Sequence, residues 1–422
     1  MLWEVFVCLL LISFILMGIH TLPFFKVKQI TPKLLALAFL FKLAGGITIY
    51  LIYSYHYTDR SSADVFKYYD DALSIAEQGE WNITHFPELF DTQKDRSQTT
   101  NKLLENTQHW DQADLILPND NRLMISINLL LLKVSADSYF FHLIFFSLLA
   151  FLGLVALLHF MQSLSMLPAK WLLIILFIPP STCLWSSGIL KESVFFFSFG
   201  FLVYGLQKLK GPKRKWSHMA VFLIGLALSF WIKTYLLVCA LPALLAYTLR
   251  GVVKTRTNLI CCGLFTSAIL VFGHEFFLNS VNHQLARFTS LATETSANSY
   301  FEIESMDDLG DFILHIPVFV YNVWIRPIFY WQGGYFSWIT VLESLTYLLI
   351  PFLLIRYRKK SQFDWTMVFM LASFVLIASL VIGSSIPVLG AILRYRSVLI
   401  PFYLLLLSTF VETSRFHQLS KK

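Results

Sequence analysis

The chain has 422 residues, of which 56% are hydrophobic, 16% aromatic and 14% charged. A mean hydropathy of +0.63 excludes an ordinary water-soluble globular protein. The formal net charge of +7 is less informative than its distribution, because the basic residues gather in a few short segments. We therefore predict an all-α, polytopic membrane protein that forms a single integral membrane domain over residues 1–422.

Apolar segments long enough to cross about 30 Å of hydrocarbon recur along the whole chain. They predict about 11 transmembrane helices, at residues 2–21, 32–54, 138–162, 171–190, 192–208, 218–232, 234–249, 257–278, 335–355, 365–383 and 389–411. The first segment is expected to be a retained span, because no Lys or Arg precedes it and no small-residue cleavage site follows. The five cysteines fall within apolar segments, at spacings that fit no metal site.

The connections between these segments differ sharply in charge. One set, which contains "KVKQITPK", "KLKGPKRK", "RGVVKTR", "RYRKK" and "RFHQLSKK", is rich in Lys and Arg and nearly free of acids. The other set is acidic and consists mainly of two long segments, 55–137 and 279–334. The positive-inside rule places the basic connections in the cytoplasm and both long segments on the outer face.

The first outer loop, 55–137, is expected to carry amphipathic and interfacial helices. Ser61 or Ser62 is expected to cap a helix whose first turn contains Asp64, where the helix dipole favours a carboxylate. The apolar run 123–134 is too short to span a bilayer, so we expect it to lie in the interface or to re-enter the membrane.

One face of the helix after Ser62 combines acidic, basic and aromatic side chains. The positions i, i+3, i+4 and i+7 are occupied by Asp64, Lys67, Tyr68 and Asp71, while Asp70 points away from this stripe. Two interpretations are compatible with the pattern. One is a solvated acidic helix, and the other is a catalytic loop whose carboxylate deprotonates an acceptor hydroxyl at the membrane surface.

Several features in order along residues 59–200 resemble the GT-C superfamily of membrane glycosyltransferases. They are the acidic first outer loop, the stretch "NRLMISINLLLLKVSADSYFFHLIFFSLLAFLGL" and the hairpin "PPSTCLWSSGILKES". The resemblance implies transfer of a sugar from a polyprenyl-phosphate-linked donor to a glycan, lipid or protein acceptor on the outer face. It further implies a bacterial inner membrane with the active side periplasmic, and a role in synthesis of a cell-envelope polysaccharide.

The resemblance assigns the acceptor base first to Asp64, with Asp70 or Asp71 as the alternative. The family often has a compact acidic pair near the start of this loop, whereas here three aspartates compete. Glu192 would be a second acidic group, at the outer end of its hairpin. Departure of a polyprenyl phosphate would need fixed cations near the membrane surface.

Candidate cations for that phosphate occur at the expected outer ends of spans: Lys191, Lys233, Arg326, Arg394 and Arg396. Arg binds phosphate as a planar fork and Lys as a point charge. Structural roles compete with binding, since Lys233 can snorkel to the headgroups and Arg326 can anchor an aromatic-rich interfacial stretch. Tyr68 is the aromatic member of the candidate binding set.

Two further features have structural and functional interpretations. Glu343 lies inside a predicted span and is expected to pair with one of the arginines. The second outer loop, 279–334, is either a solvated connector, which is the default, or a lid over an outer cavity. Tyr300 and Phe301 are its expected points of docking.

The sequence contains no HExxH, Walker A or Rossmann glycine motif, which favours a lipid-linked donor over a nucleotide sugar. We predict no protein metal site and no nucleic-acid partner, and we leave a divalent cation open as a cofactor. Two alternative functions remain. One is a polysaccharide polymerase or ligase of the O-antigen type, and the other is a transporter for a lipid-linked glycan, which would need charges through the depth of the bundle.

Overall fold

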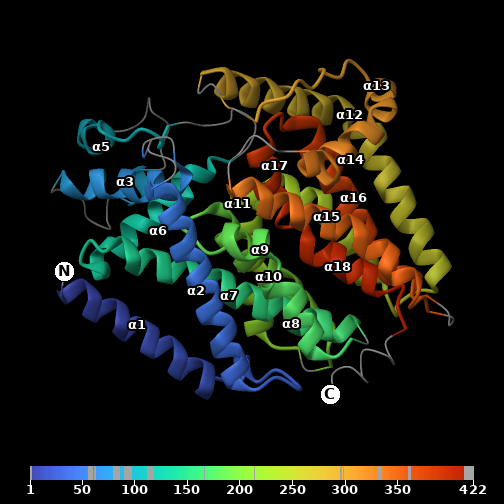
Figure 1. Cartoon of the computed structure of the whole chain (residues 1–422), viewed down its shortest axis with the longest axis horizontal. Coiled ribbons are helices and arrows are strands. Elements are labelled where there is room, and N and C mark those ends of the chain that lie inside the picture. The colour runs from blue at the N-terminus through green and yellow to red at the C-terminus, as the bar shows by residue number, and fades with distance from the viewer. Residues whose placement is uncertain are drawn as a thin grey trace. The chain divides into compact units, whose positions relative to one another are not determined.

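A computed structural model of the chain is built from α-helices (Figure 1), and no β-strand occurs among the residues it describes. Those residues are 2–55, 60, 63–78, 86–89, 97–111, 118–165, 167–212, 214–294, 297, 299–329, 335–359 and 363–412. Within them, 7 helices are long and apolar enough to cross a membrane, or up to 8 if the bent pair α17–α18 counts as one span. The chain is thus an integral membrane protein whose apolar helices contact lipid.

The 7 helices are α1 (Leu2–Thr21), α2 (Pro32–Tyr55), α7 (Tyr139–Leu164), α11 (Trp216–Leu249), α12 (Thr255–Glu294), α15 (Tyr335–Ile355) and α16 (Trp365–Ser385). The bounds of α1, α2, α7, α15 and α16 lie within two residues of the predicted segments. The all-α polytopic class is confirmed, whereas the predicted count of about 11 spans is not.

Two predicted spans are broken. Residues 171–190 form α8 (Ala169–Phe177) and α9 (Pro180–Trp185), so the prediction of one continuous helix is wrong. Pro179 and Pro180 explain the break, because proline has no N–H to continue a helix and suits the first turn of a new one. Residues 389–411 form α17 (Leu389–Arg396) and α18 (Ile400–Ser408), which meet at 55°.

Residues 218–249 were predicted as two spans, 218–232 and 234–249, and α11 covers both of them. This helix is interrupted at Lys233, whose backbone angles (φ −151°, ψ 67°) are non-helical. The predicted span 257–278 is also longer than expected, since α12 continues to Glu294. The following connection contains α13 (Leu309–Leu314), α14 (Ile316–Trp324) and the 3-10 helix η3 (Arg326–Phe329).

The chain divides into two compact units. Unit 1 comprises residues 1–159 and 183–234, and unit 2 comprises residues 160–182 and 235–422. We describe each unit by itself.

The centre of unit 1 is held together by glycine contacts between helices. A Cβ atom at Gly153 of α7 would lie 2.0 Å from the carbonyl oxygen of Phe196 in α10 (Lys191–Lys210). A Cβ atom at Gly225 of α11 would lie 2.4 Å from the backbone nitrogen of Leu202. Small residues allow backbones to approach this closely in membrane bundles. The glycines therefore fix α10 between α7 and α11, and α10 begins with Lys191 and Glu192.

A layer of shorter helices completes unit 1: α3 (Asp64–Glu77), α4 (Phe86–Leu89), α5 (Gln98–Leu104) and α6 (Asp120–Ser135). In Figure 1, α2 runs from the connection with η1 (Pro23–Phe25) to α3. Val65 and Phe66 of α3 pack with Ile49 of α2 and with Leu190. The helix α3 packs along α6, as expected for amphipathic helices with one apolar face.

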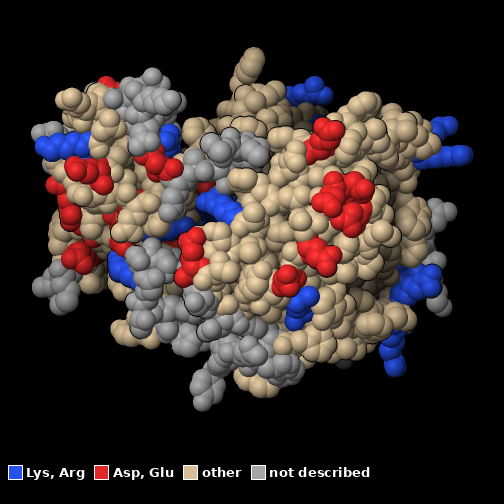
Figure 2. Space-filling model, turned by 90° about the horizontal axis from the view of Figure 1, so that it is seen from above, with Lys and Arg blue, Asp and Glu red and all other residues tan. Residues whose placement is uncertain are grey.

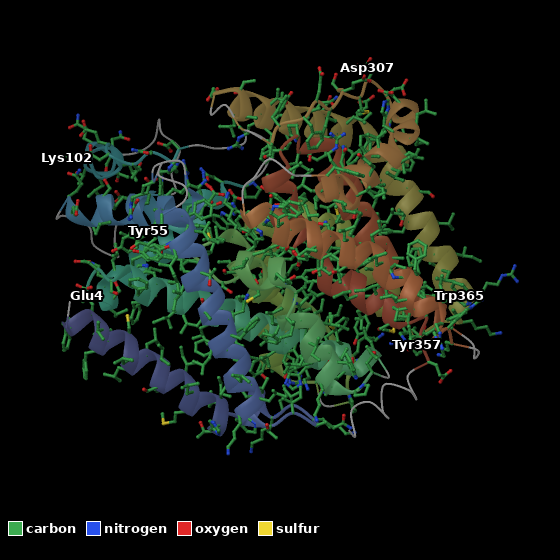
Figure 3. All side chains as sticks on the ribbon, viewed as in Figure 1. Glu4, Tyr55, Lys102, Asp307, Tyr357 and Trp365 are labelled. Atoms are coloured by element: carbon green, nitrogen blue, oxygen red, sulfur yellow. The ribbon has the colours of Figure 1, made fainter. Side chains whose placement is uncertain are left out.

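In unit 2, α14 and α12 pack on α16, and α8 packs on α18. The two ends of this unit differ in charge. Acidic residues gather near Asp307, whereas the basic connection at Tyr357 lies at the opposite end (Figure 3). Figure 2 shows groups of acidic side chains on the face seen from above. The acidic residues of the segment beside Asp307 are Glu302, Glu304, Asp307, Asp308 and Asp311.

Candidate functional site

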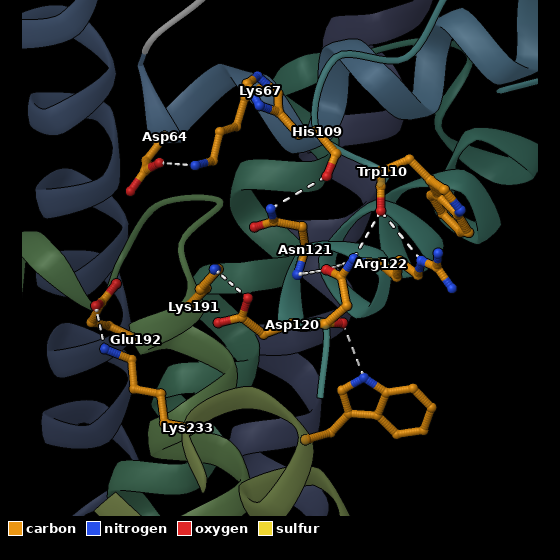
Figure 4. A network of polar contacts seen from close by, with 12 residues as sticks. Asp64, Lys67, His109, Trp110, Asp120, Asn121, Arg122, Lys191, Glu192 and Lys233 are labelled. Atoms are coloured by element: carbon orange, nitrogen blue, oxygen red, sulfur yellow. Dashed lines mark hydrogen bonds and ion pairs between the residues drawn. The ribbon is translucent and has the colours of Figure 1, made fainter. Parts of the chain in front are cut away.

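Unit 1 contains a cluster of charged side chains where α3, α6 and α10 begin (Figure 4). Asp64 is the first residue of α3, and Ala63 occupies the N-cap position without a side-chain hydrogen bond. Ser61 and Ser62, which were predicted to cap this helix, lie outside the described residues. Lys67, one turn further along, forms an ion pair with the Asp64 carboxylate.

Lys191 brings α10 into the same cluster. Its Nζ lies 2.6 Å from Oδ1 of Asp120, and its side chain is 18% exposed. The centroid of the Tyr68 ring lies 5.0 Å from Nζ of Lys67 and 5.7 Å from Nζ of Lys191. Burial lowers the pKa of Lys191, and the charges of Asp120 and Asp64 oppose that shift. Two lysines and two aspartates thus act on one another around a single tyrosine.

The acid of this cluster that sequence reasoning missed is Asp120. Asn119 caps α6 by accepting hydrogen bonds from the N–H groups of Asn121 and Arg122 at 3.1 and 3.3 Å. Nε1 of Trp231 in α11 donates to the carbonyl oxygen of Asn119 at 3.2 Å, which holds this cap on the helix core. An acid directly after an N-cap asparagine is the sequence signal that could have identified Asp120.

Glu192 and Lys233 form a buried ion pair next to this cluster (Figure 4). Nζ of Lys233 lies 2.7 Å from Oε1 of Glu192, and the two side chains are 3% and 0% exposed. The pair joins the start of α10 to the interruption of α11. Both residues were predicted at the outer ends of spans, and the structure brings them together.

The other two candidate aspartates hold the loop in place. Asp70 accepts hydrogen bonds from Nε and Nη2 of Arg60 at 2.8 and 2.7 Å, which raises the pKa of Arg60. Asp71 is buried and accepts from the N–H groups of Gln108 and His109 at 3.1 and 2.8 Å. Burial raises the pKa of Asp71, although the two hydrogen bonds oppose that shift.

We expect Asp71→Ala to lower the free energy of unfolding by about 1–3 kcal/mol, because the N–H groups of Gln108 and His109 lose their acceptor in a partly buried site. Asp71→Asn keeps a side-chain oxygen and removes a charge that burial disfavours, so its cost is expected to stay below about 1 kcal/mol. Thermal unfolding of the detergent-solubilised protein measures both. Equal losses in the two variants would contradict this role for Asp71.

Lys42 lies in the middle of α2 and is 1% exposed. Its Nζ donates to the carbonyl oxygen of Cys183 at 3.3 Å and to the hydroxyl of Ser186. Gly45 allows this contact, because a Cβ atom there would lie 2.8 Å from Sγ of Cys183. Lys42 therefore holds the segment from Cys183 to Ser186 against α2, and this segment leads to Lys191 at the start of α10.

In unit 2, two buried charged side chains contact the two helix breaks. Glu343 of α15 contacts the start of α9, and Arg396 lies at the end of α17. Glu343 accepts from the N–H of Ser181 at 2.9 Å, from the Ser181 hydroxyl, and from the Tyr347 hydroxyl at 2.5 Å. It thereby caps the first turn of α9. Arg396 is 0% exposed at the end of α17 and donates to Ser344 Oγ at 2.9 Å. Glu343 was expected to pair with an arginine. Its charge acts on Arg396 over a longer distance, and among the described residues these two side chains form no direct ion pair.

Arg326 and Arg394 also belong to unit 2. Arg394 is half-buried on α17. Arg326 donates from Nε to Oδ1 of Asn322 at 2.9 Å, and its guanidinium carbon lies 3.9 Å from the centroid of the Phe301 ring. Residues 299–301 pair with residues 387–389 through their backbones, and the Phe301 side chain docks on Arg326, whereas the Tyr300 side chain is 39% exposed.

The sequence-predicted residues thus fall into two groups. Asp64, Tyr68 and Lys191 share one cluster in unit 1, with Glu192 and Lys233 beside it, while Arg326, Arg394 and Arg396 lie in unit 2. Among the residues that the structure describes, no group of three or more His, Cys, Asp or Glu side chains is arranged to hold a metal ion. A divalent cation therefore stays an open prediction.

The fold and these buried charges define a polytopic α-helical membrane protein with a polar cluster at the junction of α3, α6 and α10. Comparison of the chain with protein-family models, with curated proteins and with solved structures finds no match.

Proposed function

We propose that this protein is a glycosyltransferase that moves a sugar from a polyprenyl-phosphate-linked donor to an acceptor hydroxyl at the membrane surface. The observation that carries the proposal is the cluster around Tyr68, in which Asp64 and Asp120 lie with Lys67 and Lys191. Transfer of a sugar from a phosphate needs a base for the acceptor and cations for the departing phosphate. This cluster supplies both kinds of group.

Asp64 is the base in this proposal, because its carboxylate lies at the start of α3 in the cluster that contains Lys67 and Lys191. Asp70 and Asp71 instead bind Arg60 and the N–H groups of Gln108 and His109. Lys67 pairs with the Asp64 carboxylate, and a carboxylate is a common general base for an acceptor hydroxyl. The acceptor hydroxyl loses its proton to Asp64 while its oxygen bonds to the anomeric carbon.

The bond between the anomeric carbon and the phosphate oxygen breaks in the same step, and that oxygen keeps the electron pair. Lys191 and Lys67 stabilise the charge that grows on the phosphate. Burial strengthens this effect for Lys191, since a cation removed from water interacts more strongly with a nearby anion. The donor-binding roles of Lys233, Arg326, Arg394 and Arg396 stay predictions.

The proposal places the cluster on the outer face of a bacterial inner membrane, with about 11 crossings. The alternation of basic and acidic connections along the sequence supports such a sidedness. The proposed acceptor is a glycan, lipid or protein of the cell envelope, and the pathway is polysaccharide biosynthesis.

A polymerase or ligase of the O-antigen type would use the same base and cations to join preassembled chains. The product separates these two functions. Loss of long glycan ladders on deletion of the gene favours the polymerase, and loss of a single sugar favours the transferase.

The breaks of α8–α9 and α17–α18 bear on the transporter alternative, since interrupted helices form substrate sites in many transporters. Here Glu343 caps the positive end of α9, and Arg396 lies at the negative end of α17. Each helix end is thus neutralised by the protein's own side chain. This arrangement favours the transferase over a transporter whose substrate would bind at these ends.

We expect Asp64→Asn to lower transfer by about 10²–10⁴-fold, the usual contribution of a general base. Membranes that contain the protein are incubated with polyprenyl-phosphate-linked hexoses, and release of polyprenyl phosphate is measured. This readout does not depend on the identity of the acceptor.

Asp111→Asn is the matched control, since Asp111 is an exposed aspartate of the same unit that pairs with Arg122. It is expected to keep full activity. Full activity of a folded Asp64→Asn variant, beside loss in Asp70→Asn or Asp71→Asn, would move the base to that residue. No release by the unaltered protein with any hexose donor would contradict the proposed function.

A further inference from the structure

Arg326 is held in a fixed orientation at the end of α14. Nε donates to Oδ1 of Asn322, and Nδ2 of Asn322 donates to the carbonyl oxygen of Gly383 at 2.9 Å. Asn322 is 1% exposed. A Cβ atom at Gly383 would lie 2.2 Å from the carbonyl oxygen of Phe319, so α14 and α16 are in close contact here. The guanidinium is therefore anchored on a rigid helix pair.

Aromatic rings cover the same guanidinium. Its carbon lies 3.9 Å from the centroid of Phe301 and 5.4 Å from that of Tyr321. Phe301 is fixed by its N–H, which donates to the carbonyl oxygen of Pro387 at 2.9 Å. Among the described residues, neither Nη of Arg326 donates a hydrogen bond or joins an ion pair. Partial burial lowers the pKa of Arg326.

An arginine fixed at Nε and stacked on aromatic rings presents its two Nη groups as a preformed fork for a phosphate. An acid from the protein would have satisfied the charge, and none of the described acids lies there. A phosphate ligand would supply the negative charge that no described acid places next to Arg326.

The surroundings of Arg326 are apolar and exposed. η3 packs on α15. Exposed large side chains of α14, η3 and α15 include Tyr321, Phe329, Trp338, Ile339 and Leu342, which are 36%, 59%, 51%, 51% and 61% exposed. Aromatic residues of this kind are enriched where a protein meets the headgroup region. A ligand with a phosphate and long apolar chains would contact both surfaces at once.

We propose that Arg326 binds the phosphate of an anionic phospholipid of the bilayer, whose acyl chains lie along the exposed face of α15. The proposal does not depend on the transferase activity. Choline and ethanolamine headgroups carry a cation that lies close to the phosphate and competes with Arg326. A phospholipid without such a cation, such as phosphatidylglycerol, is therefore preferred. A free phosphate ion would contact only the guanidinium and would bind more weakly.

The test is native mass spectrometry of the purified full chain in detergent, with added dioleoylphosphatidylglycerol, dioleoylphosphatidylcholine, polyprenyl phosphate or inorganic phosphate. We expect one phosphatidylglycerol molecule to be retained at concentrations that give no phosphatidylcholine adduct. Arg326→Gln is expected to weaken this retention by about tenfold or more, and Arg326→Lys by less, because lysine keeps the charge without the fork.

Arg256→Gln removes the same charge from an exposed position at the start of α12, and it is expected to leave retention unchanged. Phe301→Leu tests the stacking and is expected to weaken retention by about threefold. Each variant is compared after confirming that its thermal unfolding stays cooperative. Retention of phosphatidylglycerol that is unchanged in a folded Arg326→Gln variant would overturn the proposal.

Equal retention of phosphatidylcholine would also overturn it, because the headgroup charge would then not be recognised. Retention of polyprenyl phosphate without phosphatidylglycerol would assign the site to a lipid donor and reject the bilayer phospholipid. Retention of inorganic phosphate without retention of any added lipid would reject a lipid ligand.

Discussion

Replacing Lys233 by leucine is expected to lower the free energy of unfolding by about 3–5 kcal/mol. Glu192 would then be left as a buried carboxylate with 0% exposure and without its ion-pair partner. Removing one partner of a buried pair costs far more than removing both, because the remaining charge stays away from water. Denaturant unfolding in detergent micelles measures the loss.

The double variant Glu192→Leu/Lys233→Leu is expected to recover most of that stability. Lys102→Leu is the control, since Lys102 is an exposed lysine of the same unit, and it is expected to stay within about 0.5 kcal/mol of the unaltered protein. A double variant that is less stable than Lys233→Leu alone would show that the pair has a net stabilising value beyond charge compensation.

Gly153→Ala is expected to destabilise unit 1 by about 3 kcal/mol or more, at the upper end of the cost of overpacking. The added Cβ atom would lie 2.0 Å from the Phe196 carbonyl oxygen and 2.3 Å from its carbonyl carbon. Backbone atoms cannot turn aside as the end of a side chain can, so α7 and α10 must separate.

Gly263→Ala provides the matched control within α12. Nothing lies within 4 Å of a Cβ atom at Gly263, and alanine is preferred over glycine inside a helix. This variant is expected to gain about 0.5–1 kcal/mol. Similar thermal unfolding of the two alanine variants would contradict the close contact of α7 and α10.

Hydropathy and length were sufficient to predict the helices that are apolar throughout. The bounds of α7 and α16 follow from apolar runs between polar connections, and those of α2 follow from a run in which Lys42 is the interior charge. The break between α8 and α9 had a visible signal in Pro179 and Pro180, whose effect was underestimated because the run is otherwise apolar. The interruption of α11 at Lys233 had a local signal, since a lysine divides an otherwise apolar run there, but the pairing of Lys233 with Glu192 of another helix had none.

The sequence identified most of the individual residues of the candidate site, but it did not predict which of them contact one another. The i, i+3, i+4 pattern placed Asp64, Lys67 and Tyr68 on one face, because helical spacing is local. The contacts of Lys191 with Asp120 and of Lys42 with Cys183 join residues 71 and 141 positions apart. Contacts of this kind arise only when helices pack, and a single sequence contains no local signal for them.

The glycine contacts that fix α10 between α7 and α11 determine which side chains of the cluster are held most rigidly. Lys191 and the Glu192–Lys233 pair belong to this tightly interlocked core and therefore move as one rigid piece. Asp64 belongs to the thinner outer layer, which is attached through side-chain packing and a few capping bonds. In the proposed transferase, entry of a substrate would thus displace Asp64 and Lys67 on α3, while the ammonium groups of Lys191 and Lys233 stay in place.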